Sequence, residues 1–137
     1  MSNGWIAVDL DGTLAEYHGW VDGQGIGKPI PKMVERVRRW LQEGKDVRIF
    51  TARAAVAVGS EWARAEMIKE IEDWCRKNIG QSLPVTCQKD FHMIELWDDR
   101  CKQVLPNTGI AVEDLITPVS KLHLSNAYLR AKDRGEV

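Results

Sequence analysis

The segment 5–13, WIAVDLDGT, decides the fold of this chain. Its first four residues are apolar and the turn residue Gly12 follows, which is typical of a short buried strand. Asp9 and Asp11 stand at the exit of this strand, and they cannot both be core residues because an unpaired buried charge is strongly disfavoured. Strand geometry places residues two apart on the same face, and Gly12 lets the backbone turn around them. We therefore expect a concave acidic site at the carboxyl end of a strand, where open α/β sheets bind their ligands.

Two neighbouring carboxylates can bind a hard divalent cation, and one of them can also attack phosphorus as a nucleophile. The alternative is an Asp-rich turn that only caps a following helix. A calcium loop of the EF-hand type fits worse, because Leu14 and Trp20 stand where that loop needs glycine and glutamate. The segment by itself leaves the first two interpretations open.

The composition of the chain limits the class of protein. With 137 residues, 44% of them hydrophobic, there is room for one domain with a core and not for two. The net charge of -1 gives no general attraction to nucleic acid or to anionic membranes. No apolar stretch approaches the roughly 20 residues of a membrane span, and the N-terminus lacks the regions of a signal peptide. The three cysteines form no close pair, which predicts reduced thiols in a cytoplasmic protein rather than disulfides or a zinc site.

Strand and helix patterns alternate along the rest of the chain. Short apolar strands are expected at 46–50, 83–87 and 93–97, and helices at about 31–43, 60–78 and 118–133. This alternation predicts a three-layer α/β domain over residues 1–137, with a mostly parallel central sheet and helices on both faces.

Polar residues follow three of the expected strands. Asp9 and Asp11 follow the first, Thr51 the second, and Asp98 and Asp99 the last. Because the ends of parallel strands lie along one edge of the sheet, we expect these side chains to meet there. Four carboxylates in one crevice are unfavourable without a counter-charge, so a bound cation is the natural resolution. Lys89, between the last two strands, could supply a second positive group.

These residues resemble the haloacid dehalogenase (HAD) superfamily, which is dominated by phosphatases. The segment 9–14, DLDGTL, looks like its first signature, and 48–51, RIFT, looks like the second. Lys89 stands where the third signature, a lone lysine, is expected, and 95–99, ELWDD, resembles the fourth. The resemblance covers residues 5–100 and implies a Rossmann-like fold with the strand order 3-2-1-4-5.

The resemblance implies a magnesium-dependent phosphatase that forms an aspartyl-phosphate. Asp9 would be the nucleophile, and Asp11 would protonate the leaving oxygen and then activate water. Mg²⁺ would be held by the Asp9 carboxylate, the Asp11 backbone carbonyl and a carboxylate of Asp98 or Asp99, with Asp98 favoured as the direct ligand.

The same resemblance assigns the substrate contacts. Thr51 would donate a hydrogen bond to a phosphoryl oxygen, and Lys89 would pair with both Asp9 and the phosphate. Gly12, Ala52 and Arg53 are expected to line the substrate. Arg53 could clamp a second anionic group, or it could equally be a surface charge.

Many relatives carry a cap domain that closes the site, but the segment 14–31 is too short to fold as one. We expect a capless domain with a flap-like loop at 14–31. Its site is open unless Tyr17, His18 and Trp20 of this loop close over it or a partner subunit covers it, and the alternative for these side chains is ordinary packing of a loop. An open site of this kind suits a small-molecule or terminal phosphate monoester, such as a sugar phosphate, a nucleotide, a phosphoprotein or a nucleic-acid end. We expect no membrane partner, and both a nucleic-acid partner and a homo-oligomer stay open. The alternatives in function are a phosphotransferase of the same family and a non-catalytic module that binds phosphate or magnesium.

Overall fold

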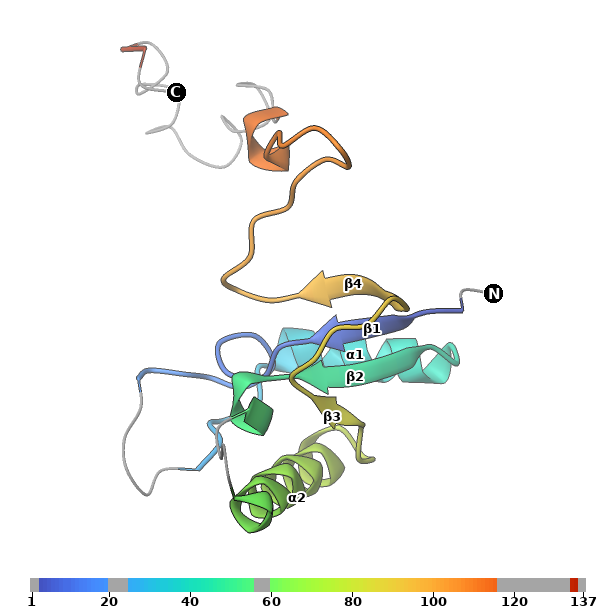
Figure 1. Ribbon diagram of the computed structural model, residues 1–137. Coiled ribbons are helices and arrows are strands. Elements are labelled where there is room, and N and C mark those ends of the chain that lie inside the picture. The colour runs from blue at the N-terminus through green and yellow to red at the C-terminus, as the bar shows by residue number, and fades with distance from the viewer. Residues whose placement is uncertain (1–2, 20–24, 56–59, 116–133, 136–137) are drawn as a thin grey trace. The chain divides into compact units, whose positions relative to one another are not determined.

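The computed structural model describes residues 3–19, 25–55, 60–115 and 134–135 of the chain (Figure 1). It divides into two compact units, residues 1–99 and 100–137, and each is considered by itself. The first unit contains, in chain order, β1 (Trp5–Val8), α1 (Pro31–Gln42), β2 (Asp46–Phe50), a 3-10 helix (Ala52–Ala55), α2 (Glu61–Asn78), β3 (Val85–Thr86) and β4 (Met93–Trp97). In the second unit, Val104 pairs with Ala111 in an isolated antiparallel bridge, and a 3-10 helix (Val112–Leu115) follows.

The four strands form one parallel sheet in the order β3-β2-β1-β4. In the register of the sheet Val8, the last residue of β1, pairs with Ile49 of β2 and with Trp97, the last residue of β4. The parallel, Rossmann-like α/β architecture predicted from the sequence is thus confirmed. The order of these strands agrees with the first four of 3-2-1-4-5, and the described residues contain no fifth strand.

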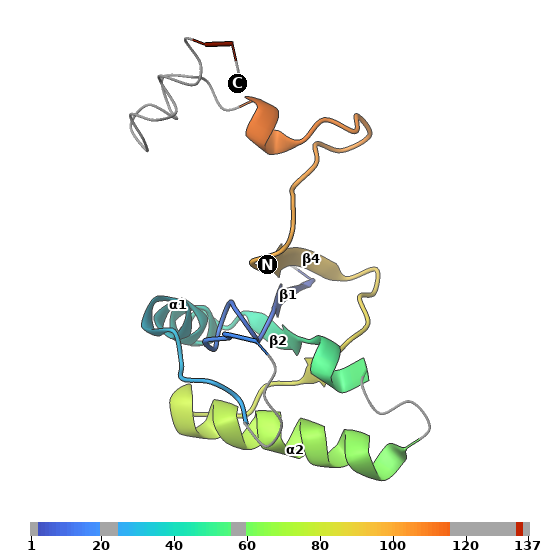
Figure 2. The same ribbon diagram turned by 90° about the vertical axis from the view of Figure 1, so that its left-hand side faces the viewer.

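Both α1 and α2 pack on the same face of the sheet (Figure 2). Alternation along the strands turns the side chains of Ile6, Val8, Val47 and Ile49 to this face, where they join a cluster of buried residues from both helices. Parallel crossovers are right-handed, so β1-α1-β2 and β2-α2-β3, which progress in one direction, place their helices on one side. Within the described residues, helices therefore cover one face of the sheet, whereas the sequence predicted helices on both faces. The predicted helix at 118–133 lies outside the described residues.

The helix ends follow local rules that the sequence carries. Pro31 occupies the first turn of α1, where its missing N–H leaves no hydrogen bond unmade. Gly44 follows this helix with a φ of 79°, in the left-handed region that glycine adopts without strain. Ser60 is the N-cap of α2, and its hydroxyl accepts a hydrogen bond of 3.2 Å from the N–H of Ala63.

Two other predicted features differ in the structure. The predicted strand at 83–87 is reduced to Val85–Thr86, since only Ile49 and Phe50 of β2 pair with it. The apolar residues Ala65, Ile68, Ile71 and Trp74/Cys75 recur at helical spacing and predict a buried stripe. On α2, only Ile71 and Cys75 are fully buried, while Ala65 is exposed. Within the part of the chain that the structure describes, no helix combines the length and the apolar character that crossing a membrane requires.

The buried cluster predicts a contrast between two isoleucines. Ile71 of α2 is 0% exposed, so Ile71→Ala leaves a cavity in the core and should lower the free energy of unfolding by about 2–5 kcal/mol. Ile94 of β4 is 49% exposed, and the same change there should cost about 1 kcal/mol or less. Urea denaturation of both variants measures the difference. Equal losses would contradict the packing described for α2.

Candidate functional site

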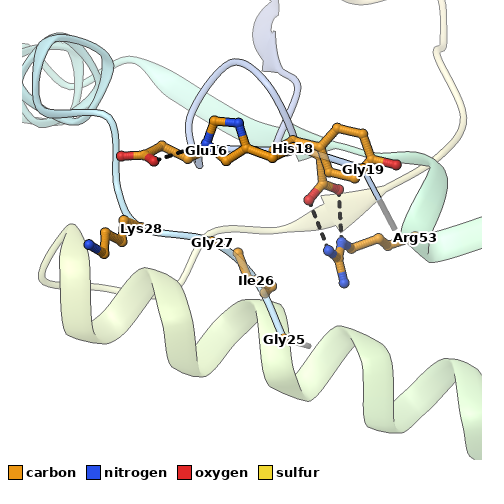
Figure 3. A pocket seen from close by; sticks show the side chains of 10 residues that line it. Glu16, His18, Gly19, Gly25, Ile26, Gly27, Lys28 and Arg53 are labelled. Carbon is orange, nitrogen blue, oxygen red and sulfur yellow. Dashed lines mark hydrogen bonds and ion pairs between the residues drawn. The ribbon is translucent and has the colours of Figure 1, made fainter. Parts of the chain in front are cut away.

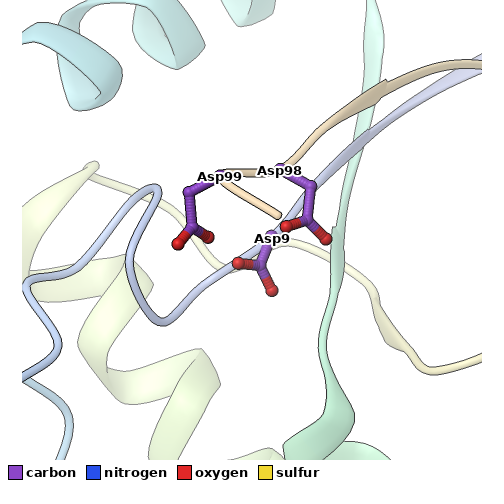
Figure 4. A group of neighbouring side chains, drawn as sticks. All are labelled: Asp9, Asp98 and Asp99. Carbon is purple, nitrogen blue, oxygen red and sulfur yellow. The ribbon is translucent and has the colours of Figure 1, made fainter. Parts of the chain in front are cut away.

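Three carboxylates meet at the carboxyl edge of the sheet (Figure 4). Asp9 follows β1, and its N–H donates a 2.9 Å hydrogen bond to the carbonyl oxygen of Trp97, the last residue of β4. Asp98 and Asp99 come next in the chain, so this hydrogen bond brings them alongside Asp9. One carboxylate oxygen from each of the three residues lies within 4.8 Å of the others. The meeting of these carboxylates that the sequence predicted is therefore present for Asp9, Asp98 and Asp99.

Thr13 joins the two sides of this acidic cluster. Its hydroxyl lies 3.3 Å from Asp9 Oδ2 and 3.1 Å from Asp99 Oδ1, and it accepts a 3.0 Å hydrogen bond from the N–H of Asp99. Thr13 was not among the site residues predicted from the sequence. The sequence feature that indicates its role is a hydroxyl residue in the turn immediately after Asp11 and Gly12, where the backbone curls around the carboxylates.

The acidic cluster is electrostatically unfavourable by itself. The pKa of Asp9 is raised from its ordinary value of 3.8 to about 7, first by burial and then by the neighbouring carboxylates of Asp98 and Asp99, while the hydrogen bond from Thr13 acts in the opposite direction. A cation among the three oxygens would remove this penalty. Carboxylate oxygens are the donor set of hard divalent cations, so these residues fit Mg²⁺.

The carboxylate of Asp11 does not belong to the acidic cluster and pairs with Arg53 (Figure 3). Arg53 Nε donates to Asp11 Oδ2 at 2.8 Å, and Nη2 donates to Oδ1 at 2.9 Å. The hydrogen bonds to Asp11 raise the pKa of Arg53 above its ordinary value, although burial opposes this. In this structure the guanidinium that the sequence assigned to a substrate anion is thus bound to a carboxylate of the protein itself.

The residues expected to bind the phosphate occupy different positions relative to the cluster. Thr51 follows β2 and is 3% exposed, and its hydroxyl accepts a 3.1 Å hydrogen bond from the N–H of Arg53. Ala52 begins the 3-10 helix and is exposed. Lys89 is also exposed, and within the described residues it makes no hydrogen bond or ion pair, so its expected pairing with Asp9 is not formed here.

Gly12 lies against the acidic cluster. Its φ of 91° falls in the left-handed region, and a Cβ at this position would lie 2.6 Å from Asp99 Oδ2. Only glycine therefore allows the turn after Asp11 to approach Asp99 this closely.

A cavity of about 430 Å³ opens beside the Asp11–Arg53 pair. Apart from these two residues it is lined by the segments 16–19 and 25–28, which include Tyr17 and Lys28 (Figure 3). The segments are joined by a 2.8 Å hydrogen bond from the N–H of Glu16 to the carbonyl oxygen of Lys28. Trp74 Nε1 of α2 also donates to the carbonyl oxygen of Gly27 at 2.9 Å. Both segments belong to the predicted flap-like loop 14–31, of which Trp20 lies outside the described residues.

Comparison with protein-family models gives no match, and neither does comparison with curated proteins. Among solved structures, a conserved protein from Bacteroides thetaiotaomicron is similar, with 22% sequence identity and a TM-score of 0.46. The alignment covers 89% of this chain and 91% of that chain. A similarity of this size carries no conclusion about function.

The position of Gly12 predicts two effects of Gly12→Ala. The left-handed φ should cost about 1–2 kcal/mol of stability, and displacement of Asp99 by the new Cβ should weaken the binding of Mg²⁺. Gly44→Ala is the matched control, because Gly44 has a φ of 79° but open space around its Cβ position. Calorimetric titration with Mg²⁺ should show weaker binding for Gly12→Ala alone. Equal affinities in the two variants would contradict a cation site at Asp99.

The raised pKa of Asp9 predicts that the binding of Mg²⁺ depends on pH. When the pH falls below about 7, the pKa of Asp9, a proton competes with the cation for this carboxylate. The affinity for Mg²⁺ should then fall by up to about tenfold per pH unit, and it should level off above pH 7. Without the cation, stability should decrease as the pH rises from about 4 through 7, because the folded state holds a proton on Asp9 that the unfolded chain releases. Titrations and thermal melts between pH 5 and 8.5 measure both trends.

Asp73→Asn is the control for these trends, because Asp73 is exposed on α2, where it pairs with Arg76. This variant should keep both trends, whereas Asp9→Asn should lose them. Equal Mg²⁺ affinity of the unmodified protein at pH 5.5 and pH 7.5 would contradict a cation ligand at Asp9 with a pKa near 7.

Proposed function

We propose that this protein is a magnesium-dependent phosphatase that hydrolyses a phosphate monoester through an aspartyl-phosphate on Asp9. The observation that carries the proposal is the meeting of Asp9, Asp98 and Asp99 at the carboxyl edge of the sheet, with the pKa of Asp9 raised to about 7. A strongly perturbed carboxylate among like charges is typical of a catalytic site rather than of an ordinary surface turn. Asp11, two residues from Asp9 in the chain, lines a cavity.

The three carboxylates would hold Mg²⁺, which supplies positive charge that offsets the charge of the phosphoryl group. An oxygen of Asp9 forms the new bond to phosphorus while the bond to the leaving oxygen breaks. Asp11 lines the cavity and stands two residues from the nucleophile, so the leaving alcohol would lie in this cavity and take its proton from Asp11. Water then replaces the alcohol, and its attack releases inorganic phosphate and restores Asp9.

Two further residues would contact the phosphoryl group. The Thr51 hydroxyl oxygen accepts a hydrogen bond from the backbone N–H of Arg53, so the hydroxyl hydrogen points in another direction. We assign this hydroxyl hydrogen as a donor to a phosphoryl oxygen. Lys89 would have to turn from its exposed position to pair with Asp9 and the phosphate. The substrate class is a small-molecule or terminal phosphate monoester, which includes a nucleotide or a nucleic-acid end.

Asp9→Asn tests the assignment of the nucleophile. With p-nitrophenyl phosphate and Mg²⁺ the unmodified protein should release inorganic phosphate, and excess chelator should abolish the release. Asp9→Asn should lose at least about a thousandfold in rate and form no covalent phosphoenzyme, since an amide is a poor nucleophile. Phosphate release and mass spectrometry of acid-quenched protein measure the two effects.

Asp73→Asn, the same change on the exposed face of α2, should retain full activity. Activity that survives the chelator, or covalent phosphate on a residue other than Asp9, would contradict the mechanism. Transfer of the phosphate to an added alcohol in place of water would indicate a phosphotransferase. Phosphate binding without turnover would indicate a non-catalytic module.

A further inference from the structure

We propose that Arg53 is a positioning residue that holds the Asp11 carboxylate where it accepts a proton from the water that hydrolyses the aspartyl-phosphate. This inference rests on the proposed function, and it adds a role for the ion pair between Asp11 and Arg53. It also replaces the expectation that Arg53 clamps an anionic group of the substrate.

The ion pair has the geometry that fixes an orientation. Two roughly parallel hydrogen bonds of 2.8 and 2.9 Å join the guanidinium to both oxygens of the carboxylate. A two-point contact of this kind fixes the plane of the carboxylate, which a single contact from lysine cannot do. The side chains of Arg53 and Asp11 are only 10% and 20% exposed, so water competes little for these hydrogen bonds.

Arg53 is itself fixed by its surroundings. Its backbone N–H donates to the hydroxyl of Thr51, the first residue after β2, and Nη1 lies 4.0 Å from Met67 Sδ of α2. The backbone of Arg53 is thus bound at the end of the sheet, and its guanidinium lies against α2. Both contacts fix where Arg53 can place the Asp11 carboxylate. A rigid support of this kind is what a catalytic group needs, because a displacement of about 1 Å can cost a hundredfold in rate.

The pairing with Arg53 turns the carboxylate of Asp11 away from the three carboxylates that would bind the cation. Asp11 lines the cavity, whereas Asp9, Asp98 and Asp99 are absent from its described lining. Asp11 therefore lines the space that the leaving alcohol vacates, and it lies two residues from the nucleophile in the chain. A water molecule that enters this space can contact the Asp11 carboxylate.

The step that follows is balanced within the site. The water oxygen forms a bond to phosphorus while its proton passes to an oxygen of Asp11. The bond between phosphorus and the Asp9 oxygen breaks, and its electron pair returns to the Asp9 carboxylate. Inorganic phosphate leaves, and Asp11 keeps the proton for the leaving alcohol of the next turnover. With p-nitrophenyl phosphate, whose leaving group takes no proton, Asp11 releases it to solvent.

Arg53→Lys separates this role from substrate binding, because lysine keeps the charge but cannot make the two-point contact. With p-nitrophenyl phosphate, whose leaving group needs no proton donor, the first chemical step should be unchanged. Hydrolysis of the phosphoenzyme should slow by about tenfold to a hundredfold. Rapid mixing should then show a burst of p-nitrophenol near one equivalent of enzyme. The steady-state kcat and KM should fall by the same factor, so that kcat/KM stays constant.

Arg76→Lys on the exposed face of α2 is the matched control and should behave as the unmodified protein. A clamp on the substrate would instead raise KM and lower kcat/KM without a burst. A merely structural role would lower kcat at constant KM, again without a burst. Either result would overturn the inference while the proposed function stands. Absence of turnover by the unmodified protein would overturn both.

Asp11→Asn gives a second test if Arg53→Lys folds poorly, which circular dichroism would show. Asp11→Asn should produce the same burst, since it removes the group that Arg53 positions. In the double variant, which combines Arg53→Lys with Asp11→Asn, hydrolysis of the phosphoenzyme should be no slower than in Asp11→Asn, because Arg53 acts only through Asp11. Additive slowing would show that Arg53 acts by itself and would overturn the inference.

Discussion

Repulsion among the carboxylates of Asp9, Asp98 and Asp99 is the constraint on which the rest of the site depends. Parallel pairing of β1 with β4 forces the carboxyl ends of both strands to one edge, and the hydrogen bond from Asp9 to Trp97 fixes their spacing. The fold therefore stabilises an arrangement that the three negative charges oppose. The pKa of Asp9 is raised to about 7 by burial and by the neighbouring carboxylates of Asp98 and Asp99. Such an arrangement is maintained by packing elsewhere, here by the cluster that joins the sheet to α1 and α2.

The two leading carboxylates have different surroundings although they are two residues apart. Asp9 faces like charges and a hydroxyl, whereas Asp11 faces a guanidinium. Enzymes that use two carboxylates for two roles commonly separate them by environment in this way. The turn around Gly12 brings the backbone against Asp99 and Thr13 to the cluster, while the side chain of Asp11 pairs with Arg53 instead.

The sequence predicted the elements that local patterns determine. The apolar runs of β1, β2 and β4 end at polar or turn residues, and each strand has the predicted limits. The extent of β3 could not be predicted, because it depends on how much of β2 remains available for pairing. The ion pair of Asp11 with Arg53 was also missed, since a contact across 42 residues requires the register of β1 against β2 and the turn after Thr51. Local patterns place both residues at one edge but do not orient their side chains.

The hydrogen bond between Glu16 and Lys28 has a consequence for how the chain can evolve or be engineered. It holds the two ends of the intervening loop together, and Trp74 anchors the Lys28 end to α2 through Gly27. Closing a longer loop costs only about 0.6 kcal/mol for each doubling of its length. Residues can therefore be inserted between these ends, even as a whole additional domain, without displacing the strands that carry the carboxylates. The shape of the cavity is in this sense separable from the carboxylates at the sheet edge, and the two can change independently.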